Sequence, residues 1–188
     1  AELRPHFARE IAYGSGIVEN LRRNPLLALG LPGFIRSLAK AVREHLADCH
    51  VIDACFTPAG IAAARGAVAG QGLVYTGHGS DIHLILRSRA YRLWFARLLK
   101  RFGQVTVVSQ SLAHTLVTSG CFEYPRVIST GIPTEAIRCK PDVKPAKTVA
   151  FAGRMIPLKR PLLIVQAWET VHRAMPGARL IMMGDGPM

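Results

Sequence analysis

Cysteine is scarce in this sequence of 188 residues, and its cysteines stand far apart. No Cys-x-x-Cys pair occurs and no histidine lies at ligand spacing from a cysteine, so the sequence favours neither a zinc site nor a disulfide framework. We interpret the cysteines as reduced and mostly buried. They are Cys49, Cys55, Cys121 and Cys139.

Long apolar runs are missing as well. No stretch reaches the ~18–20 uninterrupted apolar residues that a membrane-spanning helix requires, and the first residues lack a signal-peptide pattern. A content of 49% hydrophobic and 19% charged residues is typical of a globular protein. The expected location is the cytoplasm.

Acidic residues are few, because 24 Lys and Arg against 12 Asp and Glu leave a net charge of +12. Such a field attracts phosphates, nucleic acids or anionic lipid. No acidic residue occurs between Asp81 and Glu123. The basic residues of the first half of that segment are Arg87, Arg89, Arg92, Arg97, Lys100 and Arg101.

This basic segment has two interpretations, and both start from a helix over 88–102. Apolar side chains recur there at three and four residues and predict one packed stripe. The cationic side is then either a solvated face, which we favour, or a surface that contacts anionic membrane. The stripe consists of Tyr91, Trp94, Phe95, Leu98 and Phe102.

Two other classes of protein are disfavoured. A nucleic-acid-binding module is suggested by the charge alone, but no RNA- or DNA-binding motif is visible and aromatic residues make up only 7%. A dinucleotide oxidoreductase is disfavoured because no Gly-x-Gly-x-x-Gly follows any expected strand.

Short apolar runs alternate with helical patterns from residue 51 onward, which predicts an α/β fold with parallel sheets. Strands are expected at 51–56 and 72–76 with a helix between them, and again at 104–108. Ser109 is a plausible N-cap of the helix that follows.

A polar, proline-spaced stretch near 140–147 indicates a domain junction. The two domains are expected to be 1–143 and 144–188. The second begins with a strand at 148–152, a helix from Pro161 and another strand that ends at Met183.

The turn that follows the strand at 148–152 contains the cations Arg154 and Lys159, and the next helix points its N-terminus back at this turn. Helix N-termini bind phosphate through free N–H groups and partial positive charge. Arg154 can donate to two oxygens at once and Lys159 adds a second charge. The pattern predicts a diphosphate site.

The run from 149 to 168 resembles the phosphate-binding turn of the GT-B glycosyltransferases of family 4, whose pattern is roughly Gly-Arg-x-x-x-x-Lys-Gly before an apolar helix. Four further segments resemble that family in the same order: His-Gly-Ser-Asp within 74–81, Val-Ser-Gln-Ser-Leu within 107–112, Thr-Gly-Ile-Pro within 129–133, and Gly-Asp-Gly-Pro within 178–187.

This resemblance implies two Rossmann-like parallel sheets, incomplete at both ends. Residues 1–143 would be the later part of the acceptor-side domain, and 144–188 the start of the donor-binding domain. The implied reaction transfers a sugar from a nucleoside-diphosphate-sugar to a glycan or lipid-linked acceptor, with retention of configuration, as in polysaccharide biosynthesis. No metal or cofactor is implied besides the donor substrate.

The resemblance also implies roles for single residues. Gly153, Arg154 and Lys159 would bind the donor diphosphate. His78 and Asp81 would be catalytic, with His78 near the donor sugar, although a structural histidine and an Asx-turn or cap role of Asp81 remain alternatives. The turns of the donor cleft would be formed by Ser109, which is also a cap candidate, Gly184 and Gly186.

The sequence departs from the family pattern in three places. Arg160 replaces the usual Gly, Ser129-Thr130 replace the usual Pro-Asn, and the downstream pair of Glu residues is absent. We therefore expect the chain alone to be inactive. The alternative is a non-catalytic remnant that binds a nucleotide or a partner.

Overall fold

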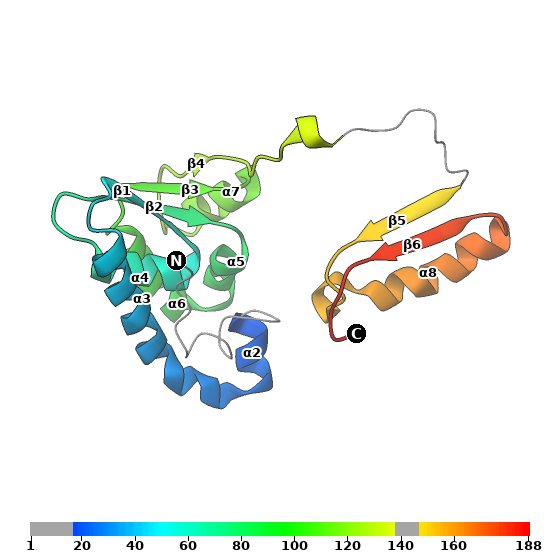
Figure 1. The fold of residues 1–188 in the computed structure, drawn as a ribbon, viewed down its shortest axis with the longest axis horizontal. Coiled ribbons are helices and arrows are strands. Elements are labelled where there is room, and N and C mark those ends of the chain that lie inside the picture. The colour runs from blue at the N-terminus through cyan, green and yellow to red at the C-terminus, as the bar shows by residue number, and fades with distance from the viewer. Residues whose placement is uncertain (1–16, 138–146) are drawn as a thin grey trace. The chain divides into compact units, whose positions relative to one another are not determined.

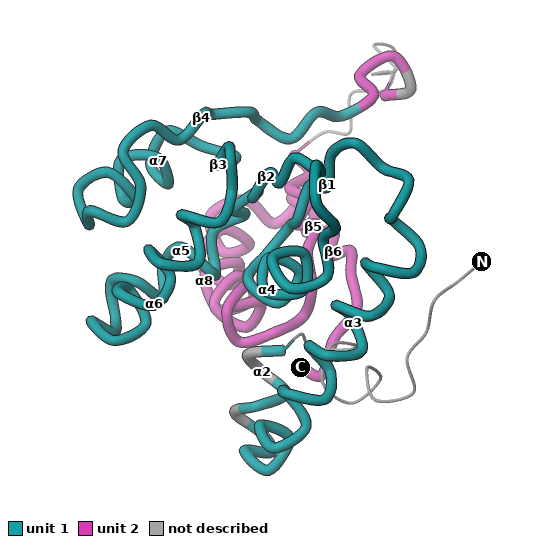
Figure 2. Tube along the Cα trace, turned by 90° about the vertical axis from the view of Figure 1, so that its left-hand side faces the viewer, with its two compact units in different colours: residues 1–132 teal, residues 133–188 magenta. Residues whose placement is uncertain are grey.

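The computed structural model describes residues 17–137 and 147–188. The chain divides into two compact units, Ala1–Ile132 and Pro133–Met188 (Figure 2). Each is described separately. The predicted junction near 140–147 lies almost wholly outside the described residues, so the predicted boundary between 143 and 144 stays a prediction.

Unit 1 is built on a parallel sheet in which the strands are hydrogen-bonded in chain order (Figure 1). Val51 pairs with Gly72, Val74 with Gln104 and Thr106 with Arg126. The α/β class with parallel sheets is confirmed. The strands are β1 (Val51–Cys55), β2 (Gly72–Gly77), β3 (Gln104–Val107) and β4 (Arg126–Val127).

Helices connect the consecutive strands. Because crossovers between parallel strands are right-handed and the strands follow one another across the sheet, the helices cover the same face. In β1, Ile52 and Ala54 are buried, whereas Val51, Asp53 and Cys55 are exposed. The connecting helices are α4 (Phe56–Gly66), α5 (Ser80–Arg87), α6 (Arg89–Leu99) and α7 (Gln110–Thr118).

The core of unit 1 centres on aromatic side chains. Tyr75 from β2 packs edge-on against Phe95 and Phe102, with ring centroids 5.5 Å apart in both pairs. All three rings are buried, and two of them, Phe95 and Phe102, belong to the predicted stripe. Trp94 is different, because 41% of it is exposed, so its assignment to the packed stripe was wrong. The helix predicted over 88–102 ends at Leu99.

The described residues before the sheet, from Ile17 onward, are mostly helical, and the last of their helices packs on α4. A Cβ on Gly66 would lie 2.3 Å from the carbonyl oxygen of Ala39, so glycine permits this close approach. The helices are α2 (Ile17–Arg23), the 3-10 helix η1 (Pro25–Gly30) and α3 (Leu31–His45).

The stretch Pro25–His45 is long and apolar enough to cross a membrane by length and composition. It is the one such stretch among the described residues, although the sequence predicted none. Core helices of soluble proteins and signal sequences share this length and composition.

Unit 2 is a βαβ unit with two parallel strands, in which Thr148 pairs with Arg179 and Ala152 with Met183. Its elements follow the expected order, and the helix begins at Pro161, as predicted. They are η2 (Thr134–Ala136), β5 (Thr148–Ala152), η3 (Pro157–Lys159), α8 (Pro161–Ala174) and β6 (Arg179–Met183).

The cysteines of the described ranges are free. Cys121 is buried as predicted, but Cys49 and Cys55 are exposed, so the prediction of mostly buried cysteines was wrong for these two. Cys139 lies outside the described residues. Desolvation, with Asp53 and Asp81 nearby, raises the pKa of the Cys55 thiol.

Candidate functional site

The turn between β5 and α8 presents the cations predicted to bind a diphosphate. Gly153 follows the last residue of β5, and Arg154 and Lys159 are both exposed before the helix begins. The first turn of α8 contains no acidic residue. Anions are therefore favoured at this helix end by the helix dipole and by two nearby side-chain charges.

A second turn, which follows β6, is hydrogen-bonded to the first. The Gly153 N–H donates to the carbonyl of Met183 and the Met155 N–H to that of Asp185, both at 2.9 Å. Gly184 has φ +146°, and a Cβ there would lie 1.9 Å from the carbonyl oxygen of Gly153. The two turns thus form one rigid structure that requires a glycine at its centre.

Gly186, two residues after Gly184, likewise permits a close approach between the two turns. Its φ is +159°, and a Cβ would lie 2.2 Å from the carbonyl oxygen of Met155. Its N–H donates to the carboxylate of Asp185 at 2.7 Å. Gly184 and Gly186 are therefore placed beside the diphosphate turn by backbone contacts, while their part in a donor cleft stays a prediction.

Arg160 caps α8 in an unusual backbone conformation. Its φ of 48° and ψ of 50° are left-handed, a region that glycine occupies without strain. The residue lies between Lys159 and the first residue of the helix. The left-handed cap explains physically why a glycine suits this position.

His78 follows the end of β2 and is exposed. Its imidazole stacks on the ring of Phe56, with centroids 4.7 Å apart and planes 24° apart. Phe56 comes directly after β1 and has φ +67°. Phe56 is not among the site residues that the sequence predicts, because the first strand was expected to extend through it, whereas β1 ends at Cys55.

Asp81 is 5% exposed, and both of its oxygens are used within unit 1. One oxygen accepts from the Tyr75 hydroxyl at 2.5 Å, and the other accepts from the Gly79 N–H at 3.0 Å. These contacts fix the loop that contains His78. The carboxylate of Asp81 is buried, whereas His78 is exposed. A catalytic role of Asp81 beside His78 stays a prediction.

The Tyr75 hydroxyl links Asp81 to the start of α4. Its one proton goes to Asp81, so Tyr75 accepts from the hydroxyl of Thr57 at 3.4 Å. Thr57 lies 3.0 Å from the Tyr91 hydroxyl. Desolvation and the nearby Asp81 raise the pKa of Tyr75 well above its ordinary value, and desolvation raises that of Tyr91.

Ser109 caps α7, since its hydroxyl accepts from the Leu112 N–H at 3.4 Å. The cap role that the sequence suggested is confirmed. A contact of Ser109 with a donor stays a prediction.

A model of the family described as Glycosyltransferase Family 4 matches residues 2–136, which is more than half of the chain. The chain belongs to glycosyltransferase family 4. Its parallel α/β units have the Rossmann-like architecture of the GT-B fold.

Among solved structures, a crystal structure of TarM is similar in fold, with a TM-score of 0.60 and 14% identity. The match covers 81% of this chain and 31% of the TarM chain, so this family 4 chain spans about a third of that protein's length. No curated protein matches the sequence.

The family 4 glycine pattern predicts a stabilising substitution. Replacing Arg160 with glycine removes the strain of a left-handed arginine and should raise the free energy of unfolding by about 1 kcal/mol, or Tm by about 2–4 °C. Thermal unfolding followed by circular dichroism measures this. An unchanged or lower Tm would mean that the Arg160 side chain stabilises the turn.

Replacing Tyr75 with phenylalanine should lower the free energy of unfolding by about 1–3 kcal/mol, because a buried oxygen of Asp81 loses its donor. The pKa of Tyr75 is raised by folding, so its contribution is complete below pH 10 and is lost as pH rises further. Urea unfolding between pH 7 and 11 should therefore give a flatter alkaline decline for the variant.

Tyr124→Phe is the matched control for this experiment, because Tyr124 is 80% exposed in the same unit. It should reproduce the stability of the unaltered protein at every pH. An equally steep alkaline decline in Tyr75→Phe would contradict the assignment of the slope to Tyr75.

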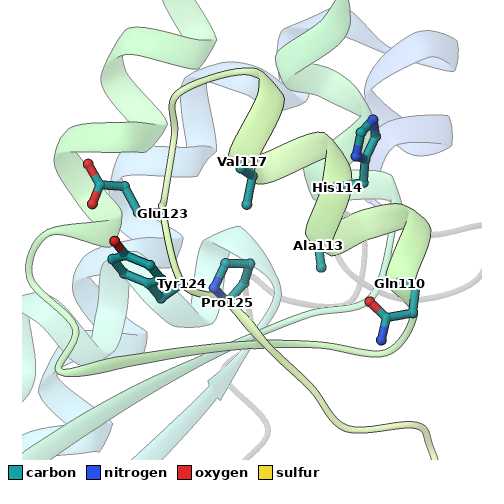
Figure 3. A pocket seen from close by; sticks show the side chains of 7 residues that line it. All are labelled: Gln110, Ala113, His114, Val117, Glu123, Tyr124 and Pro125. Carbon is teal, nitrogen blue, oxygen red and sulfur yellow. The ribbon is translucent and has the colours of Figure 1, made fainter.

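Two grooves lie on the surface of unit 1, and neither contains a predicted site residue. The larger, of about 460 Å³, runs along α7 beside the loop that leads to β4. The residues that line it come from the helix on one side and from the loop on the other (Figure 3). They are Gln110, Ala113, His114, Val117, Glu123, Tyr124 and Pro125.

The smaller groove, of about 230 Å³, lies between α4 and α6 and is basic. It is lined by Arg65, Arg97 and Arg101 around the exposed Trp94, together with Ile61, Ala64 and Leu98. Within the described ranges, no group of three or more His, Cys, Asp or Glu residues could hold a metal ion.

Proposed function

We propose that this chain is part of a retaining glycosyltransferase that transfers a sugar from a nucleoside-diphosphate-sugar to a glycan or lipid-linked acceptor, in polysaccharide biosynthesis. The observation that carries the proposal is the pair of hydrogen-bonded turns at Gly153 and Gly184, the first of which contains Arg154 and Lys159 and leads into α8. Membership of family 4 supports it.

In the proposed reaction, negative charge builds up on the diphosphate as the bond to the sugar breaks. Arg154 donates hydrogen bonds to the diphosphate oxygens, and Lys159 adds a second positive charge. Preorganised cations and helix N–H groups stabilise the transition state, in which this charge develops, more than the ground state. The activation barrier is therefore lower. This chemistry needs neither a metal nor a cofactor beyond the donor substrate.

His78 acts on the sugar in this proposal. Its imidazole is exposed at the carboxyl end of β2, the edge at which open α/β sheets bind ligands. There it donates a hydrogen bond to the sugar of the donor. Asp81 and Tyr75 hold its loop from the buried side.

The direct experiment is a calorimetric titration of the chain with uridine, guanosine and adenosine diphosphates and their sugar conjugates. One nucleotide should bind with a stoichiometry of one and be displaced by inorganic diphosphate. Single-stranded RNA is the comparison, because a basic protein binds it with a steep dependence on salt. RNA binding without diphosphate binding would contradict the proposal.

We further propose a cytoplasmic protein that contacts the inner face of an anionic membrane through α6. Exposed apolar and aromatic side chains lie on this helix together with arginines: Leu93 is 58% and Trp94 41% exposed, and Arg97 is on the same helix. Arginine and tryptophan together are typical of interfacial surfaces. The exposure of Trp94 favours this interpretation over a solvated cationic face above a packed stripe.

Cosedimentation with lipid vesicles tests the membrane contact. Binding should require an anionic lipid such as phosphatidylglycerol, and Arg97→Gln should weaken it about fivefold, since each basic residue near such a surface contributes about 1 kcal/mol. Trp94→Ala should weaken it similarly. Arg173→Gln on α8 is the charge control, because it removes an exposed arginine from another helix. Equal binding to neutral vesicles would contradict the proposal.

A further inference from the structure

Two exposed rings lie together at the carboxyl edge of the sheet in unit 1. Phe56 follows β1 and His78 follows β2, and these strands are neighbours. Their rings stack with centroids 4.7 Å apart. Phe56 is 42% exposed, so burial of its ring in the core does not account for its place.

The backbone at Phe56 is strained. A φ of +67° is a true outlier for a bulky residue. Such strain persists where the surrounding structure imposes it, and it clusters at functional sites. An exposed aromatic residue held in this conformation therefore requires an explanation other than local propensity.

A buried chain of hydrogen bonds joins the two loops beneath the rings. It runs from Thr57, the neighbour of Phe56, through the hydroxyl of Tyr75 and the carboxylate of Asp81 to the N–H of Gly79. Gly79 is the neighbour of His78. The chain therefore begins and ends one residue from the two stacked rings and fixes the spacing of their loops.

We infer that Phe56 is a positioning residue for His78. Its strained backbone and the Thr57–Tyr75–Asp81–Gly79 chain hold the phenyl ring against the imidazole, so that one face of His78 is covered and its edge points in one direction. The inference rests on the proposed function, in which His78 contacts the donor sugar. It adds a residue that acts on the sugar through His78.

The test compares three substitutions of Phe56. Phe56→Leu removes the aromatic ring at similar volume, Phe56→Tyr keeps it, and Phe56→Gly removes both the ring and the strain. Tyr124→Leu is the control, because it removes an exposed aromatic ring elsewhere in the same unit. Proton–carbon NMR of the histidine side chains, with His78 assigned from His78→Gln, reports the ring current of Phe56 on the imidazole.

In the unaltered protein and in Phe56→Tyr, the His78 ring protons should be shifted upfield. In Phe56→Leu and Phe56→Gly this shift should be lost, while Tyr124→Leu should leave it unchanged. Phe56→Gly should also raise Tm by about 2–4 °C, because the left-handed strain is relieved. His78 signals that are unaltered in Phe56→Leu, or a lower Tm in Phe56→Gly, would overturn the inference.

Binding separates this inference from the proposed function. Phe56→Leu should weaken the affinity for the nucleotide sugar by up to about tenfold and leave that for the nucleoside diphosphate unchanged, with rescue by Phe56→Tyr. Equal weakening of both ligands would overturn the inference. If the unaltered protein binds neither ligand, the proposed function fails, and the NMR comparison still decides whether Phe56 orders His78.

Discussion

Replacing Arg154 with alanine is expected to weaken binding of the nucleoside diphosphate by about 10- to 150-fold, which is the effect of losing hydrogen bonds to a charged group. Arginine donates to two diphosphate oxygens in a fixed geometry that lysine does not reproduce. Arg154→Lys should therefore recover only part of the affinity. Isothermal titration with the nucleotide that binds the unaltered protein measures both effects.

Arg173→Ala is the matched control for Arg154, because Arg173 is an exposed cation at the other end of α8, where it pairs with Glu169. Arg173→Ala changes the net charge by the same amount as Arg154→Ala and should leave the nucleotide affinity unaltered. If both substitutions weaken binding to the same extent, the nucleotide responds to the overall positive charge and the turn is not a specific site.

Replacing Gly184 with alanine is the second substitution with a large expected effect. The added Cβ would meet the Gly153 carbonyl at 1.9 Å, and alanine at a φ of +146° is strained as well. We expect the free energy of unfolding to fall by about 3 kcal/mol, because the two turns must separate. The free energy of nucleotide binding should weaken by a similar amount.

The control for this prediction is Gly177→Ala in the same unit, where an added Cβ has no atom within 4 Å. Chemical denaturation and nucleotide titration of both variants form the measurement. Unaltered stability in Gly184→Ala would show that the two turns are not packed against each other as the hydrogen bonds at Gly153 and Met155 require.

Much of the fold was predictable because its signals are local. The N-cap at Ser109 and the start of a helix at Pro161 each depend on a few neighbouring residues, and both are confirmed. Helix α5 was missed, because its eight residues begin within a glycine-flanked polar segment that reads as a loop. Trp94 was wrongly predicted to be buried. Periodicity assigns a side chain to the apolar stripe of a helix, but it does not show how far along the helix the rest of the protein packs against that stripe.

The candidate site also has a part that a local sequence pattern predicts and a part that it does not. Arg154 and Lys159 belong to one turn, so a short pattern of residues was enough to select them. The stack of Phe56 on His78 joins residues 22 positions apart, and the left-handed backbone at Phe56 has no sequence signal. Contacts between separate turns, such as Gly184 on Gly153, become visible only when the strands are paired.

We propose that a nucleoside diphosphate binds at the turn between β5 and α8. Nitrogen–proton NMR of the labelled chain, titrated with uridine and guanosine diphosphates, tests it most directly. Saturable shifts are expected at Gly153, Arg154 and the first turn of α8. Shifts confined to the basic residues of α6, or no saturable shifts with any nucleotide, would contradict it.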